Sequence, residues 1–88
     1  MKHFAVFLPM KDEEKSNQYR PEHLKFIEKM HAEGIVPLYG RFTDGDGGLI
    51  IYKARDLDEA ITFVKQDPYV DHGARGFEIH EWDINRNL

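Results

Sequence analysis

Hydrophobic and polar positions divide the first third of the chain into three kinds of segment. Lys2 to Leu8 is rich in Phe and Val and is typical of a β-strand, whereas the mixed charges from Pro9 to Tyr19 indicate a loop. Pro21 suits the first position of a helix, and Gly34 suits the position just past a helix end. Apolar residues recur at helical spacing between them, so we expect the first helix there.

The middle of the chain has the pattern of a β-hairpin. Residues Ile35 to Thr43 and Gly48 to Ala54 have the composition of strands. Between them lies the sequence Asp-Gly-Asp-Gly at positions 44–47, which favours a tight turn. We therefore expect these two strands to pair antiparallel.

A second helix and a last strand follow. Asp56 with Glu59 three residues later resembles a capping box, and Pro68 ends the helix that this pair begins. After Tyr69 to Gly73, the segment from Ala74 to Trp82 is predicted to be a strand. The remaining residues, 83–88, are predicted to be a polar tail.

The resulting order of elements is βαββαβ. Two right-handed crossovers close such a chain into a four-stranded antiparallel sheet with both helices on one face. The predicted fold is therefore an α+β ferredoxin-like sandwich that forms a single domain over residues 1–88.

The predicted strands carry apolar residues on both of their faces. A sheet covered on one side only should alternate apolar with polar residues. In the first strand, however, Phe4, Val6 and Leu8 point to one face, and Ala5 and Phe7 point to the other. The other predicted strands also have apolar residues on both faces. The residues of one face and then of the other are Val36, Leu38 and Phe42 and then Ile35 and Tyr39; Leu49 and Ile51 and then Ile50 and Tyr52; Phe77 and Ile79 and then Trp82. We therefore expect the uncovered face to pack on a second copy in a homodimer.

Composition and charge narrow the classes of function. The 88 residues include no cysteine, which excludes disulfides, thiolate nucleophiles and zinc–thiolate sites. Twelve basic against 16 acidic residues give a net charge of −4 without a basic block, so we expect neither a nucleic acid nor a membrane as partner. The apolar runs are too short for a membrane span or a signal peptide, which favours the cytoplasm. A small molecule or a protein partner remains.

His23 lies within the apolar stripe of the first predicted helix. At about 100° per residue, with His23 at zero, the apolar side chains Leu24, Phe26, Ile27 and Met30 centre within about 20° of it. This places the imidazole against the sheet and near the helix N-terminus, where burial and the dipole both disfavour a positive charge. The ordinary interpretation is a core histidine with one satisfied hydrogen bond.

Asp67 is the second candidate for chemistry. It is predicted at the end of the second helix, about 70° from the centre of its apolar stripe. A carboxylate there opposes the helix dipole, so it either faces water or is held by a donor. Because both helices cover one face, Asp67 could approach His23, and a separation above about 6 Å would exclude a working pair.

Other motifs favour structure over chemistry. The remaining histidines show no ligand spacing, so we expect no metal site: His3, His31, His72 and His80. The glycine-rich segment after Asp44 lacks the acidic ligand of a calcium loop and the Lys of a phosphate loop. The sole serine, Ser16, falls in the predicted loop, so no nucleophile triad is indicated.

The chain resembles the YciI-like family of the dimeric α/β barrel superfamily over nearly its whole length. The matching motifs lie at the start and end of the first helix, in and before the hairpin strands, in the second helix and directly after it. They are residues 20–24, Gly34, 39–40, 46–49, 58–60 and 67–69. The resemblance implies a barrel-like dimer whose sheets face each other. It also implies a His–Asp active-site pair, here His23 and Asp67, and a basic residue before the histidine, here Arg20.

One position departs from the family pattern. Arg41 follows Gly40 where many members have Pro, which affects the edge of the second strand and the local pocket lining. The family includes a dehydrochlorinase, and the superfamily includes muconolactone isomerases and heme-degrading monooxygenases. No separate motif for axial ligation supports heme chemistry in this chain.

Two functional hypotheses follow. The first is an enzyme, of lyase or isomerase type, that transfers protons without a cofactor on a small cyclic or aromatic compound. His23 is then the general acid or base, Asp67 orients it, and Arg20 offsets negative charge, with Arg41 and Tyr69 lining the pocket. The second is a non-catalytic binding or assembly domain in which His23 and Asp67 form a structural pair. A solvent-reachable pocket at the pair distinguishes the two.

Overall fold

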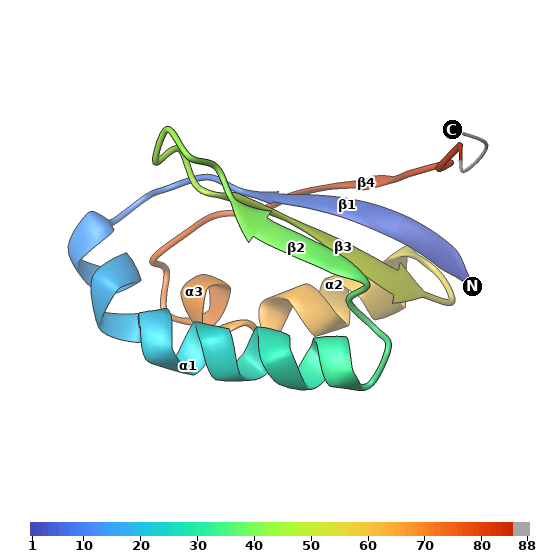
Figure 1. The fold of residues 1–88 in the computed structure, drawn as a ribbon, viewed down its shortest axis with the longest axis horizontal. Helices are drawn as coiled ribbons and strands as arrows, with labels where there is room; N and C mark the ends of the chain where they lie inside the picture. Colours follow the sequence, from blue (N-terminus) through green and yellow to red (C-terminus); the bar gives the residue numbers. More distant parts are fainter. Residues whose placement is uncertain (86–88) are drawn as a thin grey trace.

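The computed structural model of the chain describes residues 1–85, so residues 86–88 of the predicted tail lie outside the described part. A four-stranded antiparallel sheet forms one layer, and the helices form a second layer on one of its faces (Figure 1). In chain order the elements are β1 Lys2–Leu8, α1 Glu13–Ala32, β2 Leu38–Arg41, β3 Gly48–Ala54, α2 Leu57–Lys65, α3 Pro68–Asp71 and β4 Glu78–Glu81.

The strand order is β2-β3-β1-β4, with β1 and β3 in the centre. Strand β1 pairs antiparallel with both β3 and β4, and β2 pairs with β3 at the edge. Each crossover passes over one intervening strand, as the βαββαβ order requires. The predicted α+β ferredoxin-like fold is confirmed.

Helix α1 begins eight residues before the predicted start at Pro21. Asp12 caps it by accepting a hydrogen bond from the Lys15 amide at 3.1 Å, and Glu13 and Glu14 occupy the first turn. The prediction of a loop from Pro9 to Tyr19 is therefore wrong for residues 13–19. Pro21 lies inside the helix, and the first turns run at an angle to the rest (Figure 1).

Two strands are shorter than predicted, and one short helix was not predicted. Strand β2 begins only after Pro37, because proline has no amide hydrogen to donate to a neighbouring strand. The carbonyl of Ala74 accepts bonds from the amides of Lys11 and Asp12, which holds this residue outside β4. Pro68 follows the end of α2 as predicted, but it also opens α3.

The predicted hairpin and helix cap are confirmed. Residues 42–47 join β2 to β3 and include the predicted turn at 44–47. Gly47 has φ of 110°, where a Cβ would overlap the Leu8 carbonyl oxygen. Asp56 accepts a bond from the Glu59 amide at 2.9 Å. The Glu59 carboxylate accepts a bond from the Arg55 amide rather than from the cap residue itself.

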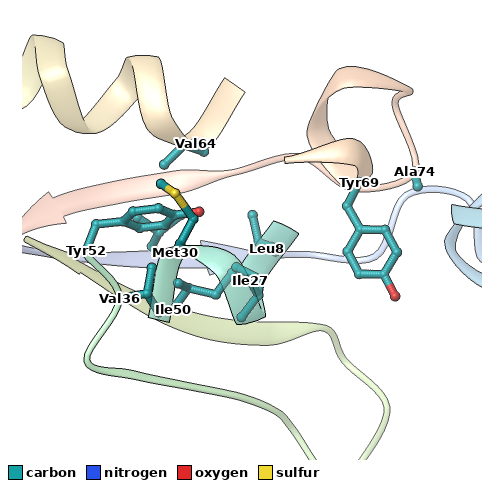
Figure 2. Packing of buried hydrophobic residues seen from close by; sticks show 10 residues of the cluster. Leu8, Ile27, Met30, Val36, Ile50, Tyr52, Val64, Tyr69 and Ala74 are labelled. Atoms are coloured by element: carbon teal, nitrogen blue, oxygen red, sulfur yellow. The ribbon is translucent and has the colours of Figure 1, made fainter. Parts of the chain in front are cut away.

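The main core lies between the sheet and the helices (Figure 2). We call this side of the sheet the helix-covered face; its fully buried side chains include Val6, Leu8, Ile50 and Tyr52. Val36 is also buried in this core, so the prediction that it shares a face with Leu38 and Phe42 is wrong. The strand alternation starts only after Pro37, because Val36 lies outside β2.

The other side of the sheet is the open face, on which Leu38, Phe42, Leu49 and Trp82 are exposed. The strand register places Leu38 beside Ile51, and the rings of Phe7 and Phe42 lie 5.8 Å apart. Strands β1, β2 and β3 therefore contribute apolar surface to this face, and Trp82 adds to it just after β4, whereas Ile79 of β4 packs against the core. No helix within residues 1–85 is long and apolar enough to cross a membrane.

Candidate active site

His23 lies near the middle of α1, on the side that faces the sheet. Ile27 and Met30, one and two turns further on, are buried in the core, and 12% of the His23 side chain is exposed. Leu24 lies off this buried stripe and is exposed. Since α1 begins at Glu13, the prediction that His23 lies near a helix N-terminus is wrong, and the helix dipole has little effect on its charge.

Asp67 lies directly before α3 and is its N-cap. Its Oδ1 accepts a hydrogen bond from the Tyr69 amide at 2.9 Å and lies 2.8 Å from Nδ1 of His23. Asp67 directly follows the C-cap of α2, close to its predicted place, and it also begins α3, where negative charge is favourable. The predicted approach of Asp67 to His23 is confirmed as geometry.

The buried carboxylate determines how the imidazole is arranged. An ionised carboxylate only accepts hydrogen bonds, so Nδ1 of His23 donates to Asp67 and carries the ring proton. Nε2 is then the nitrogen with a free lone pair, and no atom of residues 1–85 is hydrogen-bonded to it. This arrangement leaves Nε2 able to accept a proton, while Asp67 stabilises the imidazolium that forms.

Tyr69 joins the pair to a cation. Its ring stacks on the His23 imidazole with centroids 3.9 Å apart and planes inclined by 13°. The guanidinium of Arg75 lies 4.4 Å from the centroid of the same ring. Tyr69 therefore fixes the positions of two charged or ionisable groups at once.

Sequence reasoning missed Arg75 and misplaced Ser16. Ser16 is buried in the early turns of α1, where its Oγ accepts a hydrogen bond from Nη2 of Arg75 at 3.1 Å. Extending the α1 periodicity back by seven residues from His23 places Ser16 within about 20° of it, which was the available signal. Burial lowers the pKa of Arg75 from its usual range. Tyr69 and the charge of Asp67 oppose this shift, and the nearby charge of Arg20 adds to it.

A cavity of about 120 Å³ opens beside these groups. Four predicted site residues line it, together with Arg75: Arg20, His23, Arg41 and Tyr69. Asp67 lies behind His23 and is not part of the lining. A cavity of about 150 Å³ is known to hold one benzene ring, so the volume suits a ligand of one ring.

Three buried polar side-chain atoms have no hydrogen-bond partner within residues 1–85, and two of them lie near the pair. Those two are the Tyr52 hydroxyl and Oδ2 of Asp67. Burial, and then the negative charge of Asp67, raise the pKa of Tyr52, which keeps its hydroxyl protonated. Within residues 1–85, no three side chains of His, Cys, Asp or Glu lie close enough together to hold a metal ion.

Comparisons with known proteins agree with this architecture. The family model described as the YCII-related domain matches residues 1–83. The uncharacterized protein YjpA of Bacillus subtilis strain 168 is 28% identical over 81 residues, which cover 92% of this chain and 95% of that protein.

A solved structure shares the fold. The 5-chloro-2-hydroxyhydroquinone dehydrochlorinase TftG from Burkholderia phenoliruptrix AC1100, in complex with 2,5-dihydroxybenzoquinone, superposes with a TM-score of 0.80. The match covers 96% of each chain at 18% sequence identity. This likeness shows that the fold is common to both chains.

Proposed function

We propose that this chain, which belongs to the family of YCII-related domains, is an enzyme that transfers protons on a small cyclic or aromatic compound without a cofactor. The reaction class is elimination or isomerisation, since both require a proton to be removed or delivered at a defined atom. His23 is the general acid or base, and Asp67 orients and stabilises it.

The observation that carries this proposal is the hydrogen bond of 2.8 Å between the two side chains at the edge of a cavity. Asp67 is buried, so it holds Nδ1 in one orientation and leaves Nε2 of His23 for the reacting atom. A histidine buried only for packing has no need of a cavity beside it.

The other predicted site residues have supporting roles. Arg20 and Arg41 line the cavity and offset negative charge that develops on an enolate or phenolate. Tyr69 holds the His23 ring by stacking. The likeness to a dehydrochlorinase supports the same class of chemistry, because loss of HCl also removes one proton from the substrate.

The test is an anaerobic assay with 5-chloro-2-hydroxyhydroquinone and its chlorine-free parent compound. We measure chloride release and, in D₂O, exchange of ring hydrogens by NMR. We expect rates above buffer that fall by about 10²-fold or more in His23→Ala, the usual range for loss of a general acid or base. His31→Ala is the matched control, since its Nδ1 lies 2.7 Å from the Val36 carbonyl oxygen and it does not line the cavity.

An equal rate in wild type and His23→Ala would contradict the proposed role of His23. Saturable binding of these compounds without chloride release or exchange would favour the alternative, a binding domain. Asp67 supports that alternative in one respect, because it also caps α3 and so has a structural role.

We also propose that the open face packs on the same face of a second copy. Its exposed apolar residues, Leu38, Phe42, Leu49 and Trp82, form a patch that continues across the sheet through Phe7. We propose a second copy of the chain as the partner because a two-fold axis would place the apolar open face of one copy against the same apolar face of the other. This arrangement buries side chains that the helices of one chain leave uncovered.

Sedimentation velocity at micromolar concentration tests the dimer. We expect wild type to sediment as a dimer and the Leu38→Lys variant as a folded monomer, since the lysine places a charge within the interface. Leu57→Lys is the matched control, because Leu57 is exposed on α2, away from the open face, and should leave the dimer unchanged. A wild-type monomer, or equal association of both variants, would refute this arrangement.

A further inference from the structure

Three of the four arginines within residues 1–85 line the same cavity, and none of them is ion-paired. Arg20, Arg41 and Arg75 have no carboxylate within 4.0 Å in this part of the chain. Arg55, the fourth, lies away from the cavity and contacts two carboxylates, at 3.7 and 3.3 Å. In a chain with 16 acidic residues and a net charge of −4, three unpaired cations around one cavity point to a ligand that supplies the negative charge.

Arg75 is the residue for which this argument is strongest. It is only 9% exposed, and its buried Nε has no hydrogen-bond partner among residues 1–85. A buried guanidinium is costly unless an anion or several acceptors compensate it. Ser16 supplies one acceptor, and the nearest buried carboxylate, Asp67, is already bonded to His23 and to the Tyr69 amide.

The guanidinium is held in place before any ligand binds. The Arg75 amide donates to the Tyr69 carbonyl at 3.0 Å, and its backbone forms a bridge with Met10. Its side chain is fixed by Ser16 and lies over the Tyr69 ring. A planar cation held on one side by an aromatic ring is suited to bind a planar oxyanion through its remaining N–H groups.

We propose that the cavity binds the oxyanion of a one-ring substrate, a carboxylate or an ionised ring oxygen, and that Arg75 is its central binding residue. Arg20 and Arg41 add positive charge at the margin of the same cavity. The inference deepens the proposed function by naming the class of substrate, and it rests on that function only for the reaction that follows binding. The cavity volume of about 120 Å³ fits one ring rather than two.

Tyr69 lies between the proposed binding residue, Arg75, and the proposed acid or base, His23. The ring of Tyr69 contacts both the Arg75 guanidinium and the His23 imidazole, so an oxyanion bound at Arg75 brings its ring toward His23. When a base removes a proton from such a compound, negative charge grows on its oxygens, and a fixed guanidinium stabilises that charge. A neutral compound of the same shape receives neither benefit.

Calorimetric titration with matched probes tests the proposal. Benzoate and the neutral benzamide compare a carboxylate with its uncharged analogue. The anion of 2,5-dihydroxybenzoquinone and the neutral 2,5-dimethyl-1,4-benzoquinone, in which methyl groups replace the two hydroxyl groups, do the same for ring oxygens. We expect saturable binding of at least one anion, at least tenfold tighter than its neutral counterpart. The anion that binds distinguishes a carboxylate from a ring-oxygen substrate.

Variants assign the binding to Arg75. We expect Arg75→Met, which keeps the length of the side chain, to weaken anion binding at least tenfold, because charge-assisted hydrogen bonds are lost. Arg75→Lys should recover part of it, and the ion-paired control Arg55→Met should bind as wild type does. Circular dichroism establishes that each variant is folded; if Arg75→Met does not fold, Ser16→Ala replaces it and should weaken binding severalfold by releasing the guanidinium.

Equal affinity for benzoate and benzamide and for the two ring compounds would refute the proposal, as would unchanged anion binding in a folded Arg75→Met variant. The two proposals fail separately. Anion binding that depends on Arg75 without turnover contradicts only the enzyme proposal. Turnover that depends on His23, with anion binding unaffected by Arg75, contradicts only this inference.

Discussion

Two of the three histidine–carboxylate pairs within residues 1–85 have the same chemical groups and very different surroundings. His23 and Asp67 are 2.8 Å apart, with 12% and 1% of their side chains exposed, and the two residues lie 44 positions apart in the chain. His80 and Glu78 are 3.2 Å apart, with 71% and 61% exposed, and lie two residues apart on β4. The residue types are therefore a poor guide to chemistry, whereas burial and the remaining partners distinguish the two pairs.

Solvent explains the difference. Water and salt screen the exposed pair, so its geometry contributes little to stability and little restricts the histidine. The buried carboxylate cannot exchange its protein partners for water, so its two hydrogen bonds hold both the imidazole and the start of α3 in place. Only the buried pair therefore presents a fixed nitrogen to a cavity.

The largest effect should come from Asp67→Ala. This change removes the cap of α3 and the acceptor of the His23 bond, and we expect the free energy of unfolding to fall by about 3 kcal/mol. For a domain of this size, that lowers the melting temperature by about 15 °C, measured by circular dichroism. Asp71→Ala is the control on the same short helix: its carboxylate is 67% exposed, and the change should stay below about 0.5 kcal/mol.

His23→Phe should have the next largest effect. Phenylalanine keeps a ring to stack on Tyr69 but leaves Oδ1 of Asp67 with one donor fewer, and we expect a loss of about 2 kcal/mol in urea unfolding. A double-mutant cycle sharpens this prediction. If the pair is coupled, His23→Phe should cost clearly less in an Asp67→Ala background, and additive losses would show that the two side chains act independently.

Tyr52→Phe should change stability in the opposite direction. The buried Tyr52 hydroxyl has no hydrogen-bond partner in the described part of the chain, so its removal should raise the free energy of unfolding by about 1 kcal/mol. Tyr39→Phe, at an exposed tyrosine, is the control and should be neutral. A loss of stability in Tyr52→Phe would mean that this hydroxyl has a hydrogen-bond partner in solution.

The smallest effect is expected at the exposed pair. Glu78→Gln removes its negative charge, and the free energy of unfolding should change by less than about 0.5 kcal/mol, within the range for surface substitutions. Thermal unfolding at low and at physiological salt measures it. A loss as large as that of His23→Phe would remove the distinction between the two pairs.

How well the sequence predicted each feature depended on how far apart in the chain the interacting residues lie. The hairpin turn at residues 44–47 and the Asp56 cap were predicted correctly, because turn and cap preferences depend on neighbours in the chain. The start of α1 was predicted wrongly, since Pro21 is a strong local signal for a first turn. The structure tolerates this proline within a helix whose buried side, from Ser16 through Ile27, packs on the sheet.

The same distinction between short-range and long-range interactions applies to the candidate site. Periodicity placed His23 toward the sheet, and the fold topology made an approach by Asp67 possible. Nothing local indicated that Asp67 caps a separate helix, nor that the segment after Gly73 returns Arg75 to Ser16, 59 residues away. Such contacts join elements that the strand order brings together, and no spacing along the chain records them.

The sequence by itself determined the order of the four strands and the two long helices, most of their apolar faces and the candidate histidine, because these depend on periods of two and 3.6 residues. Tertiary structure alone decided which carboxylate holds that histidine, which ring stacks on it and which arginine has a buried Nε without a partner among the described residues. Those choices depend on burial, and burial becomes defined only when distant segments exclude water together.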